Sequence, residues 1–260
     1  MTLPDFGLAG WEVWLWQLLF VMVRIGAALL AAPIFGARSV PVQVRIVTAA
    51  AIGIFVLKWT PVNPPADLLA LPTMVSLLGE AVIGFALGFV LQLSFAAPLI
   101  AAEQIAGGMG MAMATAVDPA SGGQSGAIGQ FFGIMLTLVF LAIGGHLLWL
   151  RLVVDSYGLM PPGGDWFSAD QAWLVASFAS QALATAVAIA LPVTLVLLLV
   201  QVVTGVISRS APSLNLFALG LPAGVLAGIA ALIAAAPLLS DQFLALASTA
   251  IDHAGQAVTP

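Results

Sequence analysis

Apolar runs, separated by short polar or glycine- and proline-rich segments, take up most of the chain. An apolar helix needs about 20 residues to cross the hydrocarbon core of a bilayer. The pattern therefore predicts an all-α polytopic membrane protein with about six hydrophobic segments. These segments cover residues 11–35, 46–57, 71–102, 127–154, 171–208 and 214–239.

The lengths of these segments argue against a flat bundle of six equal spans. Residues 46–57 are only twelve in number, which favours half of a re-entrant hairpin. Residues 171–208 occupy 38 positions and contain Pro192, so at about 1.5 Å per residue they need either a kinked, over-long helix or a helical hairpin. We expect bent helical hairpins, with a polar loop over residues 155–170 and a weakly amphipathic tail over residues 240–260.

Glycines recur at helical spacing in two of the apolar segments. Gly84 and Gly88 form a GxxxG pair, and Gly220, Gly224 and Gly228 repeat the same spacing. Small residues at this spacing let two helix backbones approach closely. Both sets are therefore predicted to lie at helix–helix contacts.

Ionisable residues inside the apolar segments are few. Arg24 lies near the middle of the first segment and Glu80 within the third, so they are candidates for a buried charge pair. Alternatively, Arg24 extends to a membrane interface and Glu80 lies at a helix end near water. For His146 we favour a packing role over a proton relay, and we expect His253 in the tail to be solvated.

The stretch from residue 103 to 130 has the weakest helical pattern in the chain. Glycine costs a helix up to about 1 kcal/mol and proline about 3 kcal/mol, and backbone that leaves a helix in a membrane must be buried in protein or line an aqueous path. The Asp118–Pro119 step falls in this stretch. Its glycines are Gly107, Gly108, Gly110, Gly122, Gly123 and Gly126.

Three methionines alternate within the same stretch, at Met109, Met111 and Met113. Methionine is flexible and polarizable, so it can fill an irregular gap and repack when something moves past it. We interpret residues 103–126 as a movable plug between the third and fourth apolar segments.

Composition narrows the possible functions. The chain has 260 residues, of which 62% are hydrophobic and 7% charged, against roughly 25% charged residues in soluble domains. A formal net charge of -5 and the lack of a basic run argue against nucleic acid as a partner. There is no cysteine, the two histidines are far apart, and no HExxH, GxSxG or phosphate-binding glycine motif is present. We predict that the protein is not an enzyme and holds no cofactor or metal.

Residues spread in order along the whole chain resemble the FliR family, the membrane export-gate components of flagellar type III secretion. The resemblance covers residues 1–260 as a single FliR-type domain. Its C-terminal signature is Arg209, Pro212, Asn215, Phe217, Gly220 and Pro222. Further matching positions are Pro33, Phe35, Gly36, Val40, Pro41, Arg45, Glu80, Gly84, Gly88, Asp118, Pro119, Gly145, His146, Ala190, Leu191 and Pro192.

The resemblance implies a protein of the bacterial inner membrane and flagellar basal body. It implies assembly with FliP and FliQ, in contact with the lipid bilayer, into a helical gate built of bent hairpins, much of it on the periplasmic side. FlhB would associate with the cytoplasmic face, and unfolded flagellar proteins would pass through the channel. The plug loop of the family matches Gly107, Gly108, Met109, Gly110, Met111, Met113, Asp118 and Pro119.

Three alternatives stay open at this point. The injectisome relatives of the SctT type share the same plan. A small-solute secondary transporter would use the glycine-rich stretch as a broken helix at its binding site, although the chain shows no inverted repeat. A purely structural subunit would hold the stretch fixed.

Overall fold

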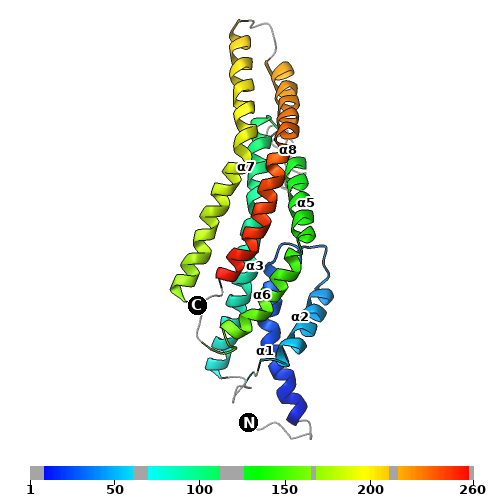
Figure 1. Ribbon diagram of the computed structural model, residues 1–260, viewed down its shortest axis with the longest axis vertical. Coiled ribbons are helices and arrows are strands. Elements are labelled where there is room, and N and C mark those ends of the chain that lie inside the picture. The colour runs from blue at the N-terminus through cyan, green and yellow to red at the C-terminus, as the bar shows by residue number, and fades with distance from the viewer. Residues whose placement is uncertain are drawn as a thin grey trace. The chain divides into compact units, whose positions relative to one another are not determined.

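The computed structural model describes residues 9–60, 62, 70–111, 126–164, 168–210 and 216–257. Every regular element within these ranges is a helix, as the apolar pattern predicts. The helices, labelled in Figure 1, are α1 (Ala9–Ala31), α2 (Val42–Leu57), α3 (Leu71–Gly108), α5 (Ala127–Ala142), α6 (Gly145–Leu159), α7 (Ala169–Ser210) and α8 (Leu216–Gln256).

These helices account for the six apolar segments of the sequence. Four described helices, α1, α3, α7 and α8, are long and apolar enough to cross a membrane, and α5 and α6, bent by 68° at the break between them, make a fifth if the pair forms one span. Helix α2 supplies the sixth segment. It begins at Val42 and has 16 residues, four more than the twelve expected, because the turn before it ends earlier than the polar pattern indicates.

Prolines lie inside the three longest helices without ending them. Pro98 is within α3, Pro192 within α7, and both Pro222 and Pro237 within α8. A proline removes one backbone hydrogen bond and bends a helix, but packing can carry the helix past it. Of the two alternatives for residues 171–208, the over-long helix is therefore correct. The expected separate tail is wrong, because α8 continues to Gln256.

The fourth apolar segment is broken where the sequence predicts a continuous run. Gly144 adopts a left-handed conformation with φ of 71°, which favours glycine, and α6 begins at the next residue. Helix α6 then runs to Leu159, so the first part of the expected polar loop over residues 155–170 is helical. The fourth apolar segment is therefore two helices, with a break in its middle at Gly144, rather than one helix.

The described chain divides into two compact units. Unit one comprises Met1–Leu93, Gly144–Phe178 and Thr249–Pro260. Figure 1 shows α1 and α2 of this unit lying side by side. Between them, the Arg45 guanidinium donates hydrogen bonds to the carbonyl oxygens of Phe35 and Ala37, at 2.9 and 2.6 Å. Arg45 thereby fixes the predicted turn that joins the two helices.

Unit two comprises Ser94–Ile143 and Ala179–Ser248. Two pairs of phenylalanines pack inside it. Phe95 meets Phe140 edge to face with ring centroids 5.5 Å apart, and Phe132 meets Phe243 in the same way at 5.4 Å. Edge-to-face pairs add to the free energy gained from burial, so they tie α3, α5 and α8 together within this unit.

In unit one, α1 packs directly on the GxxxG pair of α3. A Cβ atom on Gly84 would overlap the carbonyl oxygen of Arg24, and one on Gly88 would come within 2.5 Å of the Ala28 carbonyl oxygen. Only glycine allows these backbones to come so close. The predicted helix–helix contact at Gly84 and Gly88 is confirmed.

Gly84→Ala is expected to lower the free energy of unfolding by about 1–3 kcal/mol, since the added methyl group would overlap backbone of α1. Gly26→Ala is the matched control, because a Cβ at Gly26 meets nothing within 4 Å. Alanine in the helix should there stabilise the protein, by up to about 1 kcal/mol. Thermal unfolding in detergent, followed by tryptophan fluorescence, measures both. Equal melting temperatures for the two variants would contradict the close packing.

Candidate functional site

Arg24 and Glu80 form a buried ion pair inside unit one. Arg24 is 0% exposed and Glu80 is 2% exposed. Arg24 Nε donates to Glu80 Oε2 at 2.7 Å, and Nη2 donates to Oε1 at 3.0 Å. The contact is thus bidentate, the strongest geometry for an arginine with a carboxylate. The depth of Arg24 excludes the alternative in which its side chain extends to an interface.

Helix α6 supplies the remaining partners of the guanidinium. Nη1 of Arg24 donates to the carbonyl oxygen and the hydroxyl of Ser156, at 3.0 and 3.2 Å, and Nη2 donates to the Met160 carbonyl oxygen at 2.8 Å. The guanidinium carbon lies 4.2 Å from the centre of the Tyr157 ring, within the range of a cation–π contact. All five N–H groups of Arg24 therefore have an acceptor.

Two further hydrogen bonds complete this cluster. The Gly163 backbone N–H donates to Glu80 Oε1 at 3.2 Å, and the Tyr157 hydroxyl donates to the Val21 carbonyl oxygen at 2.7 Å. Burying two charges costs several kcal/mol each unless every polar atom is satisfied. Because every polar atom of the pair has a partner here, the pair fixes α1, α3 and α6 relative to one another at one point of unit one.

Sequence reasoning missed Ser156 and Tyr157, which it placed in a polar loop. His146 is half-buried and its Nδ1 finds no hydrogen-bond partner in the described part of the chain. The expectation of a solvated His253 is wrong, because its ring stacks on Phe178 with centroids 4.2 Å apart. Continuation of α8 past residue 240 brings His253 into that contact.

In unit two, α3 ends in a Schellman turn at the start of the predicted plug. The Met111 N–H donates to the Ala106 carbonyl oxygen and the Gly110 N–H to the Gly107 carbonyl oxygen, both at 3.0 Å. Gly110 has φ of 82°, the left-handed conformation that this turn requires and that glycine adopts most easily. The expectation that residues 103–108 leave the helix is wrong, since burial of Ile105 and Ala106 outweighs the low helix propensity of the glycines.

Met109 is the buried residue of this turn. It is 2% exposed and lies against α8, where a Cβ on Gly224 would be 3.0 Å from the Met109 carbonyl oxygen. A Cβ on Gly228 would come within 2.6 Å of Met109 Cγ and 2.9 Å of Sδ. The sequence predicts contacts at both glycines, but at Gly228 the contact is with a side chain rather than a second backbone.

The other predicted plug residues fall into two groups. Gly107 is exposed, Gly108 is half-buried against Leu197, and Met111 is half-buried. Met113, Asp118 and Pro119 lie outside the described residues, as do the glycines of the stretch from 112 to 125.

The C-terminal signature residues are spread along the ends of two helices. Arg209 is exposed in the last turn of α7. Gly220 and Pro222 lie in the first turns of α8, as does the backbone of Phe217. Pro212 and Asn215 are outside the described residues.

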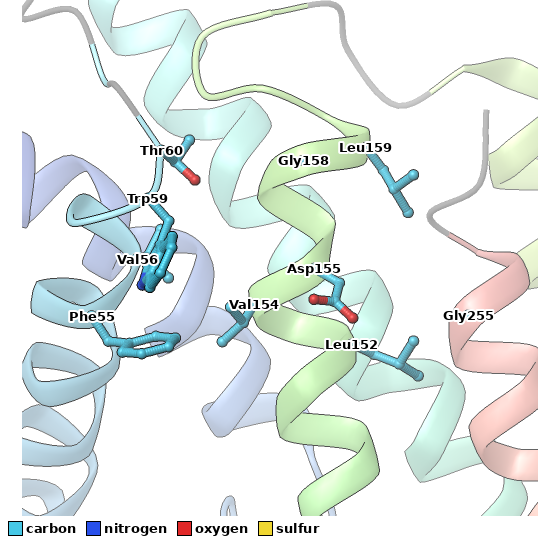
Figure 2. A pocket seen from close by; sticks show the side chains of 10 residues that line it. All are labelled: Phe55, Val56, Trp59, Thr60, Leu152, Val154, Asp155, Gly158, Leu159 and Gly255. Atoms are coloured by element: carbon cyan, nitrogen blue, oxygen red, sulfur yellow. The ribbon is translucent and has the colours of Figure 1, made fainter.

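A groove of about 710 Å³ in unit one is lined by residues at the end of α2, residues of α6 and Gly255 of α8, whose positions can be followed in Figure 2. Its lining is mostly apolar and includes Phe55, Trp59 and Leu152. Asp155 is the one charged residue among those that line it, and its carboxylate lies 3.4 Å from Arg151 Nε at the surface. Among the described residues, no group of three or more histidine, cysteine or acidic side chains could hold a metal ion.

Several apolar helices long enough to cross a membrane, with a fully satisfied ion pair buried among the helices of unit one, define a polytopic helical membrane protein. Residues 15–250 match the family described as bacterial export proteins, family 1. The chain therefore belongs to the FliR family of bacterial export proteins.

Individual relatives agree with this assignment. The flagellar biosynthetic protein FliR of Escherichia coli (strain K12) is 32% identical over 232 residues, which cover 88% of each chain. FliR of Bacillus subtilis (strain 168) is 31% identical over 214 residues, covering 78% of this chain and 80% of that protein. FliR of Aquifex aeolicus (strain VF5) is 29% identical over 229 residues, again 88% of each chain.

Arg24→Met is expected to lower the free energy of unfolding by about 3–5 kcal/mol, because it leaves the Glu80 carboxylate buried without its cation. The double variant with Glu80→Met should recover most of this loss, since neither charge remains. Chemical denaturation in detergent measures the difference.

The exposed pair of unit one provides the control for this experiment. Arg151→Met removes a cation whose side chain is 78% exposed, so it should change stability by at most about 1 kcal/mol. If the double variant Arg24→Met with Glu80→Met were as unstable as Arg24→Met alone, side-chain shape rather than charge pairing would determine the loss of stability.

Proposed function

We infer that the chain is an integral membrane component of the flagellar protein export apparatus. The observation that carries this inference is the match with flagellar FliR proteins, at up to 32% identity over 88% of the chain. The same match favours the flagellar apparatus over the injectisome, because the relatives reported above are flagellar proteins. Export across a membrane also suits a chain whose helices are mostly apolar.

The finer parts of the proposal concern location and partners. We propose that the chain lies in the bacterial inner membrane, within the flagellar basal body, with its gate on the periplasmic side. There it would assemble with FliP and FliQ, with FlhB at the cytoplasmic face, to form a channel for unfolded flagellar proteins. Large exposed apolar side chains such as Leu199, Leu226 and Ile233, each at least 66% exposed, offer surface for lipid or for partner helices.

We further propose that residues 103–126 act as a plug that closes this channel at rest. A secretion channel has to pass an unfolded chain and yet stay tight to ions when idle. The described start of the segment supports this role, because α3 ends at Gly108, the chain turns at Gly110, and Met109 makes an apolar contact with α8. Burial of a methionine is worth only about 1.5–3 kcal/mol, which a driven substrate can displace.

The proposed function is tested by removing the chain from a flagellated host and restoring it with a tag. We expect loss of flagellar protein secretion on removal, recovery with the tagged chain, and co-purification of FliP and FliQ in mild detergent. Mass spectrometry identifies the partners. A tagged chain that purifies alone, in cells whose secretion does not depend on it, would refute an export role.

Replacement of Gly110 by alanine tests the plug. The change forces a side chain into the left-handed conformation at φ of 82°, which costs about 1–2 kcal/mol, so we expect impaired export and raised ion leakage with assembly intact. Gly205→Ala on α7, outside the proposed plug, is the matched control, because its added methyl group meets nothing within 4 Å. Secretion and membrane conductance are measured in both strains. Unchanged export and unchanged tightness in Gly110→Ala would favour a structural subunit.

A further inference from the structure

The groove of unit one has the size and lining of a site for one small apolar molecule. Its volume of about 710 Å³ lies within the range of roughly 300–1,000 Å³ found for small-molecule sites. All of its lining residues except Thr60 and Asp155 are apolar or glycine, and Val154 points toward Phe55 in Figure 2. An ordered water molecule needs two to four polar partners. The groove therefore favours an apolar occupant over water.

The size of the groove favours a lipid chain over a partner helix. An α-helix with its side chains is about 10–12 Å wide and rises about 5.4 Å per turn, so one turn fills about 500 Å³. A groove of about 710 Å³ thus holds fewer than two turns, whereas a helix that crosses a membrane has about 20 residues. An acyl chain is narrower than a helix and bends freely along such a groove.

The end of α2 gives one edge of the groove the character of a membrane interface. Helix α2 ends at Leu57, and the next two residues, Lys58 and Trp59, are both exposed. The Trp59 ring lies 6.4 Å from the ring of Phe55, which also lines the groove. Tryptophan and lysine at the end of an apolar helix are typical of the headgroup level of a bilayer. This edge is therefore placed to meet lipid headgroups.

A cation and an anion lie side by side at the groove. Asp155 lines it, and Nε of Arg151, one turn earlier on α6, lies 3.4 Å from Asp155 Oδ2. The two side chains are 78% and 54% exposed. Their separation exceeds the roughly 2.7–2.9 Å of a strong charge-assisted hydrogen bond, and both groups have room for another partner. Charges on a membrane-facing surface require water, protein or a polar headgroup around them.

We propose that this groove binds a phospholipid with an ethanolamine headgroup. The acyl chain lies along Phe55, Trp59 and Val154. Arg151 donates to the phosphate oxygens, as arginine does in phosphate sites, and the Asp155 carboxylate accepts from the ammonium group. A choline headgroup has no N–H to donate, and a glycerol headgroup has no cation. The proposal goes beyond the export function and does not depend on it.

Quenching of Trp59 by brominated lipids tests the site. The full chain is placed in choline-lipid vesicles that contain increasing mole fractions of an ethanolamine, choline or glycerol phospholipid with brominated acyl chains. Bromine quenches tryptophan on contact, and subtraction of the Trp59→Phe signal isolates Trp59 among the seven tryptophans. We expect the ethanolamine lipid to reach half-maximal quenching at a mole fraction about 10-fold lower than the others, as for one charge-assisted hydrogen bond. Equal curves, or a preference for either other lipid, would overturn the proposal.

Replacement of one carboxylate tests the headgroup contact. Asp155→Asn removes the acceptor of the ammonium group, so the 10-fold preference for the ethanolamine lipid should disappear. Asp170→Asn is the matched control, because Asp170 is another exposed carboxylate of unit one but does not line the groove. An unchanged preference in Asp155→Asn would refute the assignment of the headgroup to Asp155.

Filling the groove tests where the acyl chain lies. A Cβ on Gly158, which lines the groove, meets nothing within 4 Å, so Gly158→Leu adds a side chain there without a backbone collision. We expect the selective quenching to be lost while the melting temperature is kept. Gly205→Leu on α7 is the control, since a Cβ there is equally free. Selective quenching that persists in Gly158→Leu would place the lipid elsewhere. Because no other protein is present in the vesicles, these results are independent of the secretion experiments.

Discussion

A charge buried among apolar helices is tolerated only when every polar atom on it has a partner, and unit one depends on this constraint at Arg24. Five N–H groups require five acceptors, and Glu80, Ser156 and Met160 supply them. These partners can converge only if α1, α3 and α6 meet at one rotation and one height. The close contact of α1 with Gly84, one turn from Glu80, follows from the same alignment. The ion pair thus selects one packing of helices whose apolar surfaces alone would permit several.

The same glycine spacing performs two different tasks in the two units. Gly84 and Gly88 allow a whole backbone to approach, so the contact is extended and any added side chain collides with main-chain atoms. Gly224 and Gly228 instead receive mainly one methionine, so the contact is small and its occupant is flexible. A GxxxG pattern indicates close packing in both cases, but the partner that fills the space depends on which element lies opposite.

This difference marks the limit of what the sequence could predict. Helix class, the six apolar segments and the packing glycines follow from composition and spacing, which are local properties. The break at Gly144 and the continuation of α3 through Gly107 do not, because both positions are glycines of similar local propensity. Tertiary contacts decide between them: Ile105 and Ala106 are buried against neighbours, whereas Gly144 adopts φ of 71° to begin a new helix. Ser156 and Tyr157 were missed for the same reason, since a single polar residue in or beside an apolar run gives no sign of its partner.

The cluster around Arg24 and the contact of Met109 with α8 differ in the free energy needed to separate them. Removing one partner of a buried ion pair costs about 3–5 kcal/mol, so thermal motion will rarely open the cluster around Arg24. Burial of the Met109 side chain against α8 is worth only about 1.5–3 kcal/mol. An ion pair in place of Met109 would leave a charge without its partner on opening, and closing would need the same alignment again. An apolar side chain in a glycine-lined depression avoids both costs, because it has no polar atom that must find its former partner.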